Sequence, residues 1–211
     1  MTSTVPRSGI GAPWCDFTPS AARFPVSLVG HHGGVSFNIR EAVLELERHA
    51  AGQGWDQPVR IYALVPTTDL MEREPALAEM LGLTGDVPAD DLTPVEQEPL
   101  PEDVPLEEAL GRMAWPEAVT GCALVMERLV VKGSDATLDP PDDVDAGTWA
   151  QSQEGREEVR MVAGVLRDGS RQSAMRMRSH DSEDEVLSGE DLVPALTSAL
   201  AITLEEDGEE G

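Results

Sequence analysis

Hydrophobic residues between positions 38 and 53 recur at the spacing of an α-helix. Four of them lie on one face, three or four residues apart: Ile39, Val43, Leu46 and Ala50. Asn38 stands before them as an N-cap, and Gly52 follows near the end. Residues 59–65, VRIYALV, form an apolar and β-branched run that stops at Pro66, which predicts a strand.

The remaining hydrophobic pattern predicts further helices and strands. Helices are expected from Thr67 or Thr68 to Gly82, over 105–113 and over 189–204. Strands are expected over 119–131, 158–167 and 170–178, with a short one near 95–98. The last helix should bury a stripe made of Leu192, Ala195, Leu196, Ala199, Leu200 and Thr203.

Asp168 and Gly169 separate two of these strands and predict a tight β-hairpin, because both positions of such a turn favour a positive φ. A two-residue turn sets the register. It pairs Val162 with Met175, Met161 with Arg176, Arg160 with Met177 and Val159 with Arg178. Arg176 and Arg178 are then expected to share one sheet face with Val159, Met161, Ala163 and Val165.

These elements predict an α+β fold. We expect a two-layer sandwich, with a mainly antiparallel sheet of four to five strands and helices packed on one face. Residues 1–37 show no hydrophobic period and are predicted to be a disordered extension. Residues 38–204 would form a single domain, and residues 205–211 an acidic, disordered tail.

Charge divides the chain unevenly. It has 40 acidic residues against 15 basic ones, a formal charge of −25. This excess argues against nucleic acid and anionic membrane as partners, because both bind through clustered Lys and Arg. Residues 156–180 nevertheless hold six arginines against three acids, whereas residues 68–111 hold 13 acids and one base. The predicted hairpin is therefore a locally positive part of an acidic chain.

The sequence offers no catalytic, metal or nucleotide motif. His31 and His32 have no third ligand nearby, and the acidic loop at 143–154 lacks the spacing of a calcium site. Cys15 and Cys122 cannot build a disulfide framework. No signal-peptide pattern or long apolar stretch is present, so a cytoplasmic protein is expected. We predict no cofactor, and the absence of these motifs from the sequence favours a role other than catalysis.

Two functional hypotheses remain. The first is a non-catalytic protein-binding or chaperone-like module that uses the sheet face of the 158–178 hairpin to bind a protein partner or a second copy. The second is an enzyme or small-anion binder with a pocket near Arg160, Arg178 and His180. The candidate binding residues are Arg160, Arg176, Arg178, His180, Trp55 and Trp115. The arginines could instead pair with the chain's own carboxylates, and the tryptophans could anchor strand entries.

From Trp55 onward the chain resembles a family of actinobacterial proteins that takes its name from a Propionibacterium locus. The matching stretches are WDQPVRIYALVPT at 55–67, LTPVEQEPLP at 92–101, WPEAVTGCALVMERLV at 115–130, EEVRMVAGVLRDGS at 157–170, MRSHD at 177–181 and DLVPAL at 191–196. The resemblance implies no activity, cofactor or catalytic residue, so no site is carried over from it.

Overall fold

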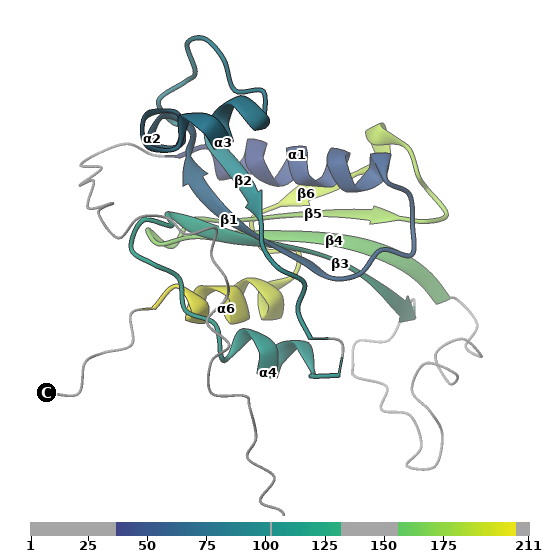
Figure 1. Ribbon diagram of the computed structural model, residues 1–211. Helices are drawn as coiled ribbons and strands as arrows, with labels where there is room; N and C mark the ends of the chain where they lie inside the picture. The colour runs from purple at the N-terminus through teal and green to yellow at the C-terminus, as the bar shows by residue number, and fades with distance from the viewer. Residues whose placement is uncertain (1–36, 102, 132–155, 206–211) are drawn as a thin grey trace, which may run out of the picture.

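The computed structural model describes residues 37–101, 103–131 and 156–205, which form one antiparallel sheet with helices around it (Figure 1). The elements in chain order are α1 (Ile39–Gly52), β1 (Arg60–Pro66), α2 (Thr67–Arg73), α3 (Pro75–Met80), β2 (Leu92–Glu96), α4 (Leu106–Leu110), β3 (Gly121–Val131), β4 (Arg156–Leu166), β5 (Arg171–Met177), the 3-10 helix η1 (Glu183–Glu185), β6 (Leu187–Gly189) and α6 (Pro194–Thr203). The strand order across the sheet is β2-β1-β3-β4-β5-β6. None of the described helices is long and apolar enough to cross a membrane.

Helix α1 covers one face of the sheet. Asn38 caps it as expected, since its Oδ1 accepts a hydrogen bond from the Glu41 N–H at 3.2 Å. Its buried side packs on one alternating set of strand residues, including Tyr62, Leu64, Ala123, Val125, Val162 and Ala174. The predicted helix at 38–53 is therefore confirmed, and its apolar stripe is the one that the spacing indicated.

Helices α4 and α6 cover the opposite face, so the prediction of two layers with all helices on one face is wrong. They pack on the other alternating set, including Ile61, Ala63, Cys122, Leu124, Ala163 and Val165. Figure 1 shows the sheet between α1 on one side and α4 with α6 on the other. The run VRIYALV already contained the reason: a strand without polar alternation is buried on both faces.

Three further expectations need correction. The sheet has six strands, not four to five, because residues 187–189 form an edge strand, β6, that the sequence did not predict; the helix expected over 189–204 included only Gly189 of these residues. Helix α6 begins at Pro194, whose ring suits a first helical turn. The helix expected up to Gly82 is split into α2 and α3 at Glu74 and Pro75, because proline cannot donate the hydrogen bond that would continue α2.

The β4–β5 hairpin has a three-residue loop, which shifts the predicted register by one residue. The Gly169 N–H donates to the Leu166 carbonyl at 3.0 Å, and the Leu166 N–H donates to the Ser170 carbonyl at 2.9 Å. Gly169 takes a φ of +88° and Asp168 accepts from the Ser170 N–H, a type I turn followed by a glycine bulge. Arg160 consequently faces Arg176, and the pairs continue with Met161–Met175, Val159–Met177 and Val162–Ala174.

This shift exchanges the two faces of β5, since neighbouring strand residues point to opposite sides. Arg176 contacts Glu47 of α1 and therefore lies on the α1 side, together with Arg178. Val159, Met161, Ala163 and Val165 belong to the α6 side. The expectation that the two arginines share a face with these four hydrophobic residues is therefore wrong.

Gly121, at the start of β3, permits the close approach of β4. A Cβ built on Gly121 would lie 2.4 Å from Cδ2 of Leu166 and 2.5 Å from the carbonyl oxygen of Val165. The second atom belongs to the backbone and cannot move away cheaply. Only glycine fits here without a shift of the two strands.

Candidate functional site

Arg176 on β5 and Glu47 on α1 form a buried ion pair between the helix and the sheet. Nε donates to Oε1 at 2.6 Å and Nη2 donates to Oε2 at 2.8 Å. The two side chains are 3% and 2% exposed. Nη1 of Arg176 also donates to Asp181 at 3.2 Å. The hydrogen bonds to Glu47 are the main reason that the pKa of Arg176 is raised.

Trp55, in the loop after α1, brings two more arginines into the same region. Cζ of Arg160 lies 4.4 Å from the centroid of the indole, and Cζ of Arg178 lies 5.5 Å from it, both within the range of cation–π contacts. Nε1 of Trp55 donates to Asp181 at 2.9 Å. That hydrogen bond, with the nearby guanidinium of Arg176, lowers the pKa of Asp181.

Arg160 and Glu127 fix the loop of Trp55 to the sheet. Arg160 is 1% exposed, and its Nε and Nη2 donate to Oε1 of Glu127 at 3.1 and 2.8 Å. Its Nη2 also donates to the Gly54 carbonyl, while its Nη1 is buried without a hydrogen-bond partner. Oε2 of Glu127 accepts from the N–H groups of Asp56 and Gln57 at 2.7 and 3.2 Å.

Arg178 closes the exposed side of this group. It pairs with Asp56 at 3.1 Å and with Glu158, and these hydrogen bonds raise its pKa. Because the Arg178 side chain is 41% exposed, water screens both pairs and each contributes little to stability. Arg178 therefore borders the cluster, whereas Arg160 and Arg176 lie inside it.

Within the described residues, the other predicted site residues, His180 and Trp115, make no hydrogen bond to this cluster. His180 is exposed and its Nδ1 lies 2.7 Å from Oγ of Ser179. Trp115 is buried on the α6 side, where its Nε1 donates to Oγ1 of Thr203 at 2.9 Å. Thr203 also lies 3.6 Å from Sγ of Cys122, and burial raises the pKa of that thiol to about 12. Cys122 is thus a buried core residue whose thiol is unreactive.

The structure therefore gathers four of the six predicted residues: Arg160, Arg176, Arg178 and Trp55. The arginines pair with the chain's own carboxylates, as the alternative interpretation of the sequence allowed, but the sequence did not identify Glu47, Asp56, Glu127 and Glu158 as partners beside Asp181. One signal was available. Glu47 follows Val43 by four residues and so falls on the apolar stripe of α1, where a carboxylate requires a cation. Three guanidinium groups facing five carboxylates leave no net positive charge for an incoming anion.

A row of long apolar side chains crosses four strands on the α6 side of the sheet. Met126, Met161, Met175 and Leu187 are direct cross-strand partners from β3 to β6, and we call them the apolar row. Exposure rises along it, from 5% at Met126 through the half-buried Met161 and Met175 to 50% at Leu187. The adjacent row nearer α6, Leu124, Ala163 and Ser173, is completely buried. The apolar row therefore lies at the edge of the part of the sheet that α6 covers.

A groove continues from the apolar row toward α4 and α6. Its floor is Met126 and Met161, and its walls come from both helices, with Leu106, Leu110, Val193, Leu196 and Ala199 among the lining residues. Its volume is about 370 Å³, and apolar side chains form most of its surface. This size lies within the range of binding sites for small molecules or side chains of a partner.

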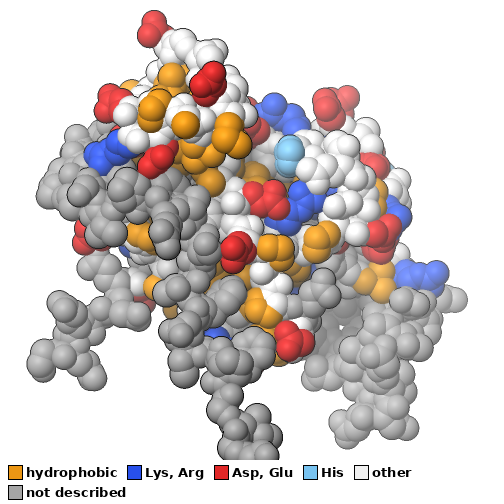
Figure 2. All heavy atoms as spheres, viewed as in Figure 1, with side chains coloured by type: hydrophobic (Ala, Val, Ile, Leu, Met, Phe, Trp, Pro, Cys, Tyr) orange, Lys and Arg blue, Asp and Glu red, His pale blue; other side chains and the backbone are white. Residues whose placement is uncertain are grey.

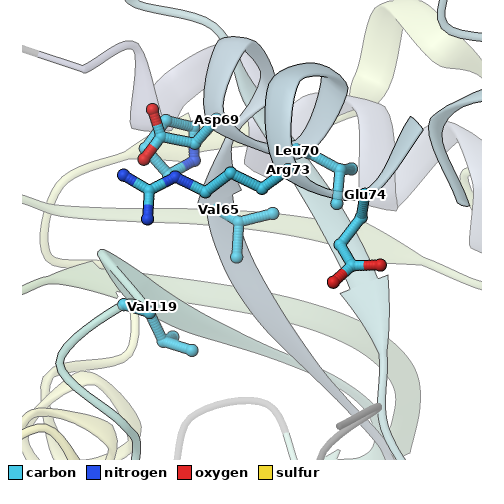
Figure 3. A pocket seen from close by; sticks show the side chains of 8 residues that line it. Val65, Asp69, Leu70, Arg73, Glu74 and Val119 are labelled. Atoms are coloured by element: carbon cyan, nitrogen blue, oxygen red, sulfur yellow. The ribbon is translucent and has the colours of Figure 1, made fainter. Parts of the chain in front are cut away.

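The apolar region around α2 and α3 differs from this groove. Figure 2 shows hydrophobic side chains over these two helices and a mixture of acidic and basic side chains elsewhere on that face. The cavity beneath α2, with Val65, Leu70 and Val119 around it, has a volume of about 20 Å³ (Figure 3). That volume holds about one water molecule, far less than a substrate requires.

The described residues thus define a three-layer α+β protein with an ion-paired arginine cluster on one sheet face and an apolar groove on the other. They contain no group of three or more His, Cys, Asp or Glu residues that could hold a metal ion. The chain belongs to the PPA1309-like protein family, whose model matches residues 39–205. The family is named from a Propionibacterium locus and no function comes with the name. No curated protein and no solved structure matches the chain.

Proposed function

We propose that this protein is a non-catalytic binding module for another protein, and that the partner docks on the α6 side of the β4–β5 hairpin. The observation that carries the proposal is the apolar row with its continuous groove, where Met161 belongs to both. Partly exposed methionines adapt their shape to a partner and are frequent at such surfaces. A chaperone-like role and a cytosolic setting belong to the same proposal.

The alternative, an enzyme or anion site near Arg160, Arg178 and His180, has less support. The guanidinium groups of Arg160 and Arg178 are already bound to carboxylates of the chain, and His180 bonds to Ser179 instead of joining them. The unpartnered Nη1 of Arg160 is buried, so a ligand would have to open the cluster to reach it. Opening would break several ion pairs, which opposes binding of a small anion.

The proposal is tested by photo-crosslinking in cells. A photoreactive amino acid at position 175, on the apolar row, is expected to crosslink to a discrete protein. The same amino acid at position 48, on the exposed side of α1, serves as the control and should not. Identical products from both positions, or none from position 175, would contradict the proposal.

The captured protein is then purified and its affinity measured by calorimetry. Met161→Glu and Met175→Glu together should weaken binding by at least about tenfold, because a carboxylate would be buried against apolar side chains. Met80→Glu is the matched control, since Met80 is 84% exposed on α3 and away from the groove. Equal affinities of the two variants would exclude the apolar row as the docking surface.

A further inference from the structure

The outer border of the apolar row, at β6, is acidic. Residues 183–191 contain five acids and no base: Glu183, Asp184, Glu185, Glu190 and Asp191. All five are exposed, and they flank Leu187, the outer end of the row. On the opposite border, Glu107 of α4 lines the groove and Arg128 of β3 is the base among its lining residues. The apolar row is thus bordered by a negatively charged edge at β6 and by one charge of each sign on the side of α4 and β3.

We propose that the segment bound there is basic and amphipathic, with apolar side chains on the apolar row and Lys or Arg side chains toward the acidic border at residues 183–191. This inference rests on the proposed binding function and specifies the partner. Long aliphatic stems of Lys and Arg can lie along Met161 and Met175 while their charged ends reach Glu183–Glu185. The chain's charge of −25 favours the approach of a basic partner and repels acidic ones.

The same charges oppose a second copy of this chain as the occupant. A symmetric pair formed through the β6 edge would bring the segment of Glu183–Glu185 against its own copy. Like charges placed across an interface oppose association. The acidic border therefore favours a heterologous basic partner over a homodimer through the β6 edge.

The test uses three fluorescent peptides of about 18 residues, roughly five helical turns. The first is an amphipathic Leu/Lys peptide, the second replaces Lys with Glu, and the third keeps Lys but replaces Leu with Ser. Fluorescence anisotropy with the full chain should give binding of the Leu/Lys peptide at least about tenfold tighter than of either other peptide. Its affinity should also fall as salt is raised, because exposed charges are screened.

Protein variants separate this binding from general attraction to an acidic chain. Met161→Glu with Met175→Glu adds negative charge, so non-specific binding of the Leu/Lys peptide would rise, whereas binding at the apolar row should fall about tenfold or more. Met80→Glu adds one charge away from the groove and should leave the affinity unchanged within about twofold. Circular dichroism of each variant verifies that it remains folded.

Reversing the charge of the acidic border completes the test. Replacing Glu183, Asp184 and Glu185 with Lys should shift the preference toward the Leu/Glu peptide by at least about tenfold. If the Leu/Lys and Leu/Glu peptides bind equally well and both depend on Met161, the basic partner is excluded while the binding surface stands. If no peptide binding depends on Met161 and Met175, the inference is overturned, and the crosslinking result alone decides the proposed function.

Discussion

Removal of one partner of the Arg176–Glu47 pair should destabilise the protein strongly. Glu47→Leu leaves the guanidinium of Arg176 at 3% exposure with Asp181 as its remaining carboxylate. Two charge-assisted hydrogen bonds of 2.6 and 2.8 Å are lost. At about 1.5–3 kcal/mol for each such bond, the expected loss is about 3–6 kcal/mol, which overlaps the roughly 3–5 kcal/mol of other broken buried pairs.

A double variant tests whether the stability depends on the ion pair as a unit. Glu47→Leu with Arg176→Met removes both charges and refills the space with apolar side chains, so it should lose less stability than either single variant. The measurement is urea unfolding followed by circular dichroism, since guanidinium salts would themselves screen the ions. Glu41→Leu is the control, because its pair with Arg48 is about half exposed and should cost less than about 1 kcal/mol.

Two outcomes would refute this reasoning. The first is a loss below about 1 kcal/mol for Glu47→Leu, which would mean that the buried guanidinium finds other partners. The second is additivity, in which the double variant loses the sum of the two single losses. Either result would show that Arg176 and Glu47 do not act as a coupled pair.

Three further predictions concern the core and the Trp55 loop. Gly121→Ala should cost about 1–3 kcal/mol in urea unfolding, or more, because its Cβ would meet backbone atoms, whereas Gly52→Ala, with open space around it, should cost nothing. Cys122 should resist a thiol reagent at pH 8 until the protein unfolds, since its pKa is raised to about 12; peptide mapping of the labelled chain identifies it, and rapid labelling of the folded state would contradict its burial. Trp55→Phe keeps an aromatic ring but removes the N–H donor, so the pKa of Asp181 should rise toward its ordinary value in a carboxyl NMR titration. Ionised Asp181 stabilises the fold at pH values above the ordinary carboxyl pKa, and this stabilisation is lost as pH falls through the lowered pKa. Stability should therefore depend less on pH in the acid range in that variant.

The sequence predicted the elements better than their arrangement. The helical period of residues 38–53 and the continuous apolar run at 59–65 identified α1 and β1, because both patterns are local properties of the sequence. The sixth strand escaped detection because three residues, 187–189, are too few to show a period. The second helical layer was missed because continuous apolar strands were interpreted as facing one core, although both of their faces are buried.

For the candidate site, too, the sequence predicted local features but not their tertiary contacts. The concentration of arginine in 156–180 drew attention to Arg160 and Arg176, but their carboxylate partners come from distant segments, such as Glu47 from α1. Such pairs depend on tertiary contacts that local spacing does not encode. The apolar row was not predicted, because an error of one residue in the hairpin register moved Met175 to the other face.

The three-residue loop at 167–169 also makes this part of the chain unusually sensitive to insertion and deletion. If a single residue is lost there and the loop keeps three residues by taking in Ser170, every following position of β5 changes sides. Arg176 would leave Glu47 and Met175 would enter the α1 layer. A surface loop normally accepts changes in length more easily than a core accepts changes of side chain. In this hairpin a change in loop length would disturb the core more than a change of side chain within the loop. We therefore expect family members to keep the length of this loop even where its residues differ.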